Sequence, residues 1–349
     1  PKAGKTILLR RPPIALVHGY NTAGDWGAGF NNRLAASRGY DFVKTIRYGQ
    51  EPQDVSDQER ETTVLRFGQL VPKLEQEFEF LRTEIAADGW AMTRFDVVAH
   101  SQGGVLTRML CSQNANSFLD LPFRNPGNFY RGRFHRVITV GSPHNGTRLV
   151  SFMTRAASRL SLEPAQMGVA RLISNYMISS GNSQPKFDPF GPDIRLLQSP
   201  AASAPWYPDA GAMFHLVATT VNQGQSPAIG SGTPSEAALG LTSLYGPAIL
   251  PHGSDGVVDF DSQTATTPEA GQSPPPNSYR MPATQNISHA LVVQAGVNIF
   301  GGDQGQVDSI SVATHAIGAL DQDPALPAQE RVFGPFRLAI PLPPSVAAN

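Results

Sequence analysis

One segment constrains this chain more than any other. Residues 95–106 read Phe-Asp-Val-Val-Ala-His-Ser-Gln-Gly-Gly-Val-Leu, so an apolar run typical of a buried strand meets a helical pattern at Ser101. A serine in so sharp a turn needs small neighbours two positions before and after it, and Ala99 and Gly103 meet that need. The segment predicts a strand–turn–helix unit with Ser101 as a candidate nucleophile. The alternative is an ordinary connection in which the serine only caps the helix.

The rest of the first half alternates short apolar runs with helical patterns. Residues 61–87 space their apolar side chains three and four positions apart, which predicts an amphipathic helix that Gly89 ends. A second helix is expected at 103–111. Strands are expected at 6–9, 14–17, 42–48, 95–99, 136–140 and 214–221. This alternation predicts an α/β fold with a mostly parallel central sheet, helices on both faces, and a ligand site at the carboxyl ends of the strands.

The run Ala-His-Ser-Gln-Gly-Gly at 99–104 resembles the nucleophile motif of bacterial lipases and esterases of the α/β-hydrolase superfamily. Lecithin–cholesterol acyltransferase-like and inositol-deacylase-like lipases are similar. Ala99 replaces the first glycine of the Gly-x-Ser-x-Gly pattern and keeps a small side chain there. The resemblance extends over about residues 12–300 as a series of ordered motifs. It implies the α/β-hydrolase fold, with a helical lid or cap insertion.

A second motif, Leu-Val-His-Gly-Tyr at 16–20, joins a strand to a His-Gly pair. In the lipases it resembles, two backbone N–H groups hold the negative oxygen of the attacked carbonyl. They belong to the residue after His-Gly and the residue after the nucleophile, which here are Tyr20 and Gln102. His18 is expected to order the loop and not to transfer protons. The glycine-containing stretch 24–29 predicts a flexible loop next to it.

The resemblance also implies the chain order serine, acid, histidine. A Gly-Ser-Asp-Gly-Val-Val-Asp run resembles the element that carries the acid, which makes Asp255 the candidate and leaves Asp259 and Asp261 as alternatives. His289, where a polar loop gives way to an apolar helical start, is the candidate base, and His315 is the alternative. Asp255 would accept the Nδ1–H of His289 and so direct Nε2 of the imidazole toward the nucleophile.

A third run, Gly-Ser-Pro-His-Asn-Gly at 141–146, also resembles lipases, where it shapes a wall near the acid loop. His144 is therefore expected to be structural. Ser142 is a poor candidate nucleophile, because Pro143 blocks the helical turn that would have to follow it.

The whole chain, 1–349, is expected to form a single domain. Residues 147–212 interrupt the strand–helix alternation with Met-, Leu- and Phe-rich helical patterns, which fit either a lid over the site or ordinary packing on the core. Residues 223–251 and 264–282 are expected to be irregular loops, and 318–349 an irregular C-terminal tail.

Composition limits the partners. Hydrophobic residues make up 40% of the chain and charged residues 16%, which suits a packed core, and the net charge of −1 gives no bulk attraction for nucleic acid. No apolar run reaches the roughly 20 residues of a transmembrane segment. No cofactor and no zinc-type site is expected. The sequence leaves open whether the protein binds a structural calcium ion. The single cysteine, Cys111, allows no intrachain disulfide, and secretion and a cytoplasmic location both stay open.

Together the motifs predict a serine carboxylic-ester hydrolase that acts on small-molecule or lipid esters with hydrophobic acyl groups through an acyl-enzyme. Transient contact with a lipid interface would follow from a lid. A phospholipase, thioesterase or acyltransferase would use the same residues. A non-catalytic binding module on the same fold is the alternative from a different class.

Overall fold

The structure is a computed structural model that describes residues 11–20, 26–37, 42–48, 66–111, 132–148, 187, 194, 213–220, 253–265, 278–281, 285, 287–289, 293–294, 297–298 and 304–321. The strand expected at 6–9 lies outside the described residues. So do the loop expected at 223–251, most of the segment 147–212 and the tail beyond residue 321.

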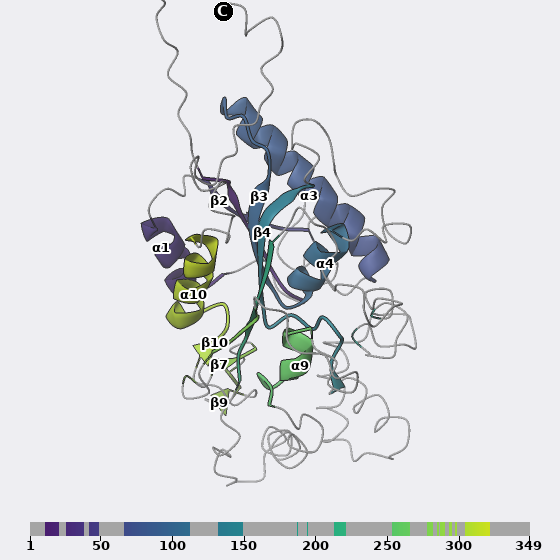
Figure 1. Cartoon of the computed structure of the whole chain (residues 1–349), viewed down its shortest axis with the longest axis vertical. Helices are drawn as coiled ribbons and strands as arrows, with labels where there is room; N and C mark the ends of the chain where they lie inside the picture. The colour runs from purple at the N-terminus through teal and green to yellow at the C-terminus, as the bar shows by residue number, and fades with distance from the viewer. Residues whose placement is uncertain are drawn as a thin grey trace, which may run out of the picture.

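A six-stranded sheet, parallel throughout, forms the centre of the described structure (Figure 1). Its strands lie in the order β2-β1-β3-β4-β5-β6. They are β1 (Ile14–Val17), β2 (Val43–Ile46), β3 (Phe95–His100), β4 (Phe134–Val140), β5 (Met213–Ala218) and β6 (Ser278–Arg280). All six residues of β3 are buried, as expected for an inner strand with both faces covered.

Strand β6 corrects the expectation that 264–282 is wholly irregular. Ser278–Arg280 pairs in parallel with β5, with Val217 opposite Tyr279. Three residues are too few for an alternating pattern to show in the sequence. The strand exists because β5 offers it an edge, which is a tertiary and not a local cause.

Helices cover both faces of the sheet (Figure 1). Helices α3 (Phe67–Ala87) and α4 (Gln102–Cys111) lie on one face, and α1 (Ala28–Ala36) and α10 (Ile310–Asp321) on the other. The apolar stripe predicted for α3 is buried along its length and consists of Phe67, Leu70, Val71, Leu74, Phe78, Leu81 and Ile85. Gly89 follows the helix with a φ of 84°, a left-handed conformation that glycine adopts without strain.

Two further expectations need correction on the α1/α10 face. The stretch 24–29 was expected to be a flexible loop, but Gly27 immediately precedes α1 and Gly29 lies in its first turn. Phe30 and Leu34, one helical turn apart, are fully buried in the cluster that α10 shares, which explains why this segment is helical. Helix α10 also continues through Asp321, so residues 318–321 are helical and not part of an irregular tail.

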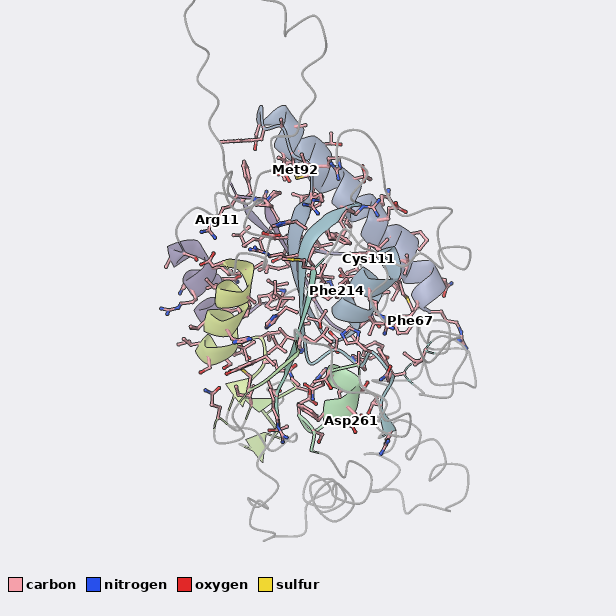
Figure 2. All side chains as sticks on the ribbon, viewed as in Figure 1. Arg11, Phe67, Met92, Cys111, Phe214 and Asp261 are labelled. Carbon is pink, nitrogen blue, oxygen red and sulfur yellow. The ribbon has the colours of Figure 1, made fainter. Side chains whose placement is uncertain are left out.

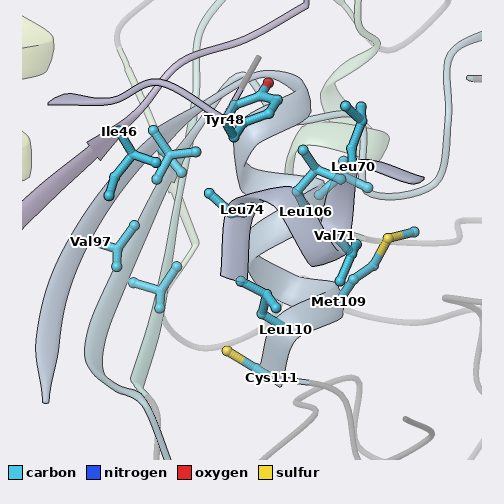
Figure 3. Packing of buried hydrophobic residues seen from close by; sticks show 14 of the residues in the cluster. Ile46, Tyr48, Leu70, Val71, Leu74, Val97, Leu106, Met109, Leu110 and Cys111 are labelled. Atoms are coloured by element: carbon cyan, nitrogen blue, oxygen red, sulfur yellow. The ribbon is translucent and has the colours of Figure 1, made fainter. Parts of the chain in front are cut away.

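The described residues form two apolar core clusters, one on each face of the sheet. Strand β1 shows the division, because Ala15 and Val17 join the α3/α4 cluster whereas Ile14 and Leu16 join the α1/α10 cluster. Figure 3 shows part of the first cluster, where Leu74, Leu106 and Cys111 pack with Val97 of the sheet. Of the helices in the described ranges, none combines the length and the apolar character that a bilayer span requires.

Candidate active site

The carboxyl ends of three neighbouring strands come level at one edge of the sheet. Val17 of β1 lies opposite Ala99 of β3, and His100 of β3 lies opposite Val140 of β4. The residues that follow these strands therefore emerge side by side. Helix α9 (Phe260–Gln263), β7 (Ile287–Ser288) and β10 (Gln304–Gly305) lie at this same end (Figure 1). In Figure 2, Asp261 of α9 lies at the opposite end of the molecule from Met92, which precedes β3.

Ser101 stands in a strained turn between β3 and α4. Its φ is 52°, a left-handed value that is uncommon for a residue with a side chain. The Ser101 N–H donates to the Val140 carbonyl at 2.9 Å, which holds the turn to the end of β4. A Cβ on Gly103 would lie 2.5 Å from the His18 carbonyl oxygen, so only glycine lets α4 begin this close to β1. The sequence prediction of a strand–turn–helix unit at Ser101 is therefore confirmed.

A hydrogen-bonded chain joins Ser101 to His289 and His289 to Asp255. His289 Nε2 lies 2.8 Å from Ser101 Oγ, and His289 Nδ1 lies 2.8 Å from Asp255 Oδ2. An ionised carboxylate only accepts hydrogen bonds, so Nδ1 carries the proton and Nε2 is left to accept from the serine hydroxyl. This tautomer is the one a general base for Ser101 requires.

The Asp255 carboxylate is fully buried and accepts hydrogen bonds at both oxygens. Oδ1 accepts from the backbone N–H groups of Val257 at 3.0 Å and Val258 at 2.7 Å. Oδ2 accepts from His289 and from the side-chain amide of Gln306, the latter at 2.9 Å. These donors stabilise a negative charge where water cannot reach it.

The two alternative acids, Asp259 and Asp261, lie nearby at the start of α9. Asp259 is the N-cap of α9, where its Oδ1 accepts from the Ser262 N–H at 3.1 Å. Burial raises the pKa of Asp259 above its ordinary value. Asp261 lies in the first turn of the same helix. Of the three candidate acids, the structure brings Asp255 to His289.

The alternative base, His315, belongs to a different cluster. It lies in α10, where its Nε2 is 2.9 Å from His215 Nε2 and its ring stacks on Tyr279. Burial, with a smaller contribution from His215, lowers the pKa of His315 to about 4. The structure thus places His289, and not His315, against the Ser101 hydroxyl.

Tyr20 and Gln102, the expected oxyanion donors, flank the serine. Gln102 is the first residue of α4, so its N–H points out of the helix N-terminus. Gly19, just before Tyr20, approaches the nucleophile closely, because a Cβ there would lie 3.0 Å from Ser101 Cβ. Both backbone positions therefore lie next to Ser101.

Sequence reasoning missed Tyr48, which braces the His18–Tyr20 loop. Its hydroxyl donates to the carbonyls of His18 at 3.1 Å and Gly19 at 3.2 Å and accepts from the Gln102 side-chain amide at 3.0 Å. The Gly19–Tyr20 peptide is trans, so a carbonyl turned toward Tyr48 turns the Tyr20 N–H the opposite way. His18 stacks on the Tyr48 ring at 4.4 Å, in the ordering role expected for it.

The 141–146 run is packed in the interior beside the candidate site. His144 is fully buried, its Nε2 lies 3.0 Å from Thr139 Oγ1, and its carbonyl accepts from Arg108 at 3.0 Å. Burial, with the neighbouring Arg108 charge, lowers the pKa of His144 well below its ordinary value. A neutral, fully buried histidine of this kind suits the structural role expected for it. Ser142 is also fully buried, which agrees with its exclusion as a nucleophile.

One part of the expected lid segment reaches the site. Phe187 is buried, its ring meets the Tyr20 ring edge-on at 6.0 Å, and its carbonyl accepts from the Thr147 N–H. Ile194 is likewise buried in the core. These two residues pack on the core, and the rest of 149–212 lies outside the described residues.

Two buried side chains behind the triad also escaped sequence reasoning. His100 Nε2 lies 2.9 Å from Gln306 Oε1 and 3.1 Å from the His289 carbonyl. Burial, with a smaller contribution from His289, lowers the pKa of His100 to about 3, so this imidazole is neutral. His100 could have been noticed as the neighbour of Ser101, but Gln306 lies in no motif.

The described residues contain no group of three or more His, Cys, Asp or Glu side chains placed to share a metal ion.

No family model matches the chain, and no curated protein matches its sequence. Solved structures do match. Lipase 1 from Pelosinus fermentans superposes with a TM-score of 0.51 at 15% identity, over 90% of this chain and all of that one. The chain has the α/β-hydrolase fold. Two other solved structures match with lower TM-scores. The metagenomic carboxyl esterase MGS0156 has a TM-score of 0.47 at 13% identity, over 91% of this chain and 80% of that one. The Bacillus licheniformis lipase BlEst2 in its propeptide form has a TM-score of 0.44 at 14% identity, over 90% and 51%.

Proposed function

We propose that this α/β-hydrolase-fold protein hydrolyses carboxylic esters with hydrophobic acyl groups through a covalent acyl-enzyme. Ser101 Oγ attacks the ester carbonyl carbon while His289 Nε2 takes the hydroxyl proton. Asp255 stabilises the imidazolium that forms. The carbonyl oxygen becomes an oxyanion, and the N–H groups of Tyr20 and Gln102 donate to it. Such a donor typically contributes about 3–4 kcal/mol to transition-state stabilisation.

The intermediate then collapses and the bond to the alcohol oxygen breaks. His289 returns its proton to the departing alkoxide, which leaves an ester between the acyl group and Ser101. A water molecule repeats the sequence, with His289 as its base, and releases the carboxylic acid and the free serine. The proposal requires no cofactor.

The observation that carries the proposal is the pair of 2.8 Å contacts that His289 makes with Ser101 Oγ and Asp255 Oδ2. If Ser101 only capped a helix, its hydroxyl would have no need of a hydrogen bond to a histidine nitrogen that is free to accept its proton. The strained φ of Ser101 supports the same conclusion, since strain of this kind persists at sites where it serves a function.

Apolar surroundings favour a hydrophobic acyl group. Phe187 joins the Tyr20 ring to Phe67 at the start of α3, with ring centroids 6.0 and 5.5 Å apart. Tyr20 also carries one of the N–H groups proposed to hold the oxyanion, so this aromatic cluster adjoins the proposed oxyanion site.

The test is the hydrolysis of p-nitrophenyl butyrate and p-nitrophenyl palmitate by the wild-type chain and by Ser101→Ala. The proposal predicts that the wild type cleaves at least one ester and that the variant loses at least about a thousandfold in kcat/KM. The ratio of the two rates begins to define the acyl length. Absence of cleavage by the wild type, or an active Ser101→Ala, would overturn the proposal.

A further inference from the structure

Gln306 is a fully buried side chain whose two amide hydrogens and carbonyl oxygen all have hydrogen-bond partners at the candidate site. Gln306 directly follows β10 and belongs to none of the sequence motifs that carry Ser101, Asp255 and His289. Nε2 donates to Asp255 Oδ2 at 2.9 Å and to Thr219 Oγ1 at 2.6 Å, and Oε1 lies 2.9 Å from His100 Nε2. Both amide hydrogens and the carbonyl oxygen therefore have partners.

The protonation states of its neighbours fix the orientation of this amide. The His289 carbonyl oxygen, 3.1 Å from His100 Nε2, can only accept, so Nε2 carries a hydrogen, and the Gln306 amide therefore presents Oε1 to it. A flipped amide would place Oε1 against the Asp255 carboxylate and Nε2 against an N–H donor. Either contact is repulsive, so the amide has one allowed orientation.

Gln306 binds the same carboxylate oxygen that His289 binds. His289 becomes an imidazolium when it accepts the Ser101 proton. The attraction between Asp255 Oδ2 and this imidazolium therefore affects how readily His289 takes the proton. A hydrogen bond donated to a carboxylate spreads part of its negative charge and weakens its pull on another proton. Asp255 Oδ2 shares its charge between these two donors, and Oδ1 is occupied by the two backbone N–H groups.

We propose that Gln306 is a positioning residue that orients Oδ2 of Asp255 and limits how strongly that carboxylate holds a proton on His289. Its effect is to keep His289 neutral, and so able to act as a base, down to lower pH. This inference rests on the proposed function, in which His289 is the base. A brace that only ties strand ends together would affect stability without changing the titration of His289.

The chain offers a matched control in Gln263. It is also a fully buried glutamine near Thr219, but within the described residues its amide contacts only backbone groups of Thr219 and Val258. Gln263→Met removes a comparable set of buried hydrogen bonds without removing a donor to Asp255. It separates loss of a structural brace from loss of the charge-sharing contact.

The experiment measures kcat/KM for p-nitrophenyl butyrate from pH 5 to 9 in wild type, Gln306→Met, Gln306→Glu and Gln263→Met. In Gln306→Met we expect the acidic limb of the profile of kcat/KM against pH to move up by about 0.5–1 pH unit. We also expect kcat to be about tenfold lower or more, with KM within about threefold of the wild-type value. Gln306→Glu keeps a donor to Asp255 only while its carboxyl group is protonated and places a second negative charge there once it ionises, so the acidic limb of its profile also moves up. Gln263→Met keeps the wild-type limb, and thermal unfolding confirms that each variant is folded.

A second readout needs no turnover. The imidazole Cε1–H resonance of His289, followed by NMR from pH 4 to 9 in the Ser101→Ala background, should show the same order of midpoints. Unmoved midpoints or superimposable limbs in both Gln306 variants would overturn the role of Gln306. If the wild type cleaves no ester, the proposed function fails, and the NMR titration still decides whether Gln306 tunes His289.

Discussion

Gly104 in α4 faces Ser142 so closely that a Cβ on Gly104 would lie 2.0 Å from the Ser142 hydroxyl oxygen. Both residues are fully buried, so neither has room to move aside. The contact fixes how near the helix that begins at the candidate nucleophile lies to the end of β4. It also makes the pair a sensitive point for stability.

Gly104→Ala is therefore expected to lower the free energy of unfolding by about 1–3 kcal/mol, the usual range for overpacking a core. Adding Ser142→Gly removes the opposing side chain and should recover most of that loss. Gly318→Ala in α10 is the control, since apart from the backbone of its own helix no described residue has an atom within 4 Å of the added Cβ, and it should gain about 0.5–1 kcal/mol. Denaturant unfolding measures all of these variants. Equal stability of Gly104→Ala and Gly318→Ala would contradict the close contact.

Asp255→Asn tests the charge behind His289. The residues are joined twice, because the His289 N–H also donates to the Asp255 carbonyl at 2.8 Å, and that backbone bond survives the substitution. The loop should therefore stay in place while the carboxylate is lost. We expect kcat for ester hydrolysis to fall by roughly 10⁴-fold, as happens when a triad acid becomes an amide. A loss of less than tenfold in a folded variant would exclude Asp255 as the acid.

Tyr48→Phe tests the brace of the proposed oxyanion loop. The phenyl ring keeps its stacking on His18, but the carbonyls of His18 and Gly19 lose their hydroxyl donor. We expect kcat to fall about 10–100-fold with KM within about threefold, and stability to fall by about 1–3 kcal/mol. Tyr279→Phe, in β6 against His315, is the matched control and should keep its kcat within about twofold. An equal effect of both substitutions on kcat would argue against the brace.

His100 predicts a fall in stability at acid pH. Burial lowers its folded-state pKa from 6.5 to about 3, so the folded protein keeps it neutral while the unfolded chain protonates it below pH 6.5. Stability is lost as pH falls through 6.5, and the loss continues to about pH 3, where the folded state also takes up the proton. Between pH 7 and pH 5 this one group should cost about 2 kcal/mol.

The measurement is urea unfolding at pH 7 and pH 5 for wild type and His100→Asn. The difference in free energy between the two pH values should shrink by about 2 kcal/mol in the variant, whatever its absolute stability. The remainder comes from other groups with lowered pKa values, such as His144 and His315. The same pH dependence in both proteins would show that His100 is not buried as a neutral group.

Those features of the fold that have local causes could be predicted from the sequence. Strand β1 occupies the predicted residues, and the apolar spacing of α3 marks the face that is buried, because side-chain periodicity directly reflects one-sided burial. The grouping of Ser101, Asp255 and His289 could be anticipated only from the order of motifs along the chain.

Other features have causes that no local pattern carries. Strand β6 forms because β5 offers an edge, and α1 is stabilised by its contact with α10. Tyr48 and Gln306 matter through side-chain hydrogen bonds to residues distant in sequence. A buried tyrosine or glutamine looks the same in the sequence whether its polar atom meets a structural carbonyl or the acid of a triad.

The most direct test of the central claim is intact-protein mass spectrometry after treatment with an alkyl fluorophosphonate, which transfers a phosphonyl group to a serine activated by a neighbouring base. If Ser101 is the nucleophile, the wild type gains one phosphonyl group on the peptide that contains Ser101, and Ser101→Ala gains none. His289→Ala should react far more slowly. A wild type that stays unlabelled, or a Ser101→Ala variant labelled as fully as the wild type, would contradict the assignment of Ser101 as an activated nucleophile.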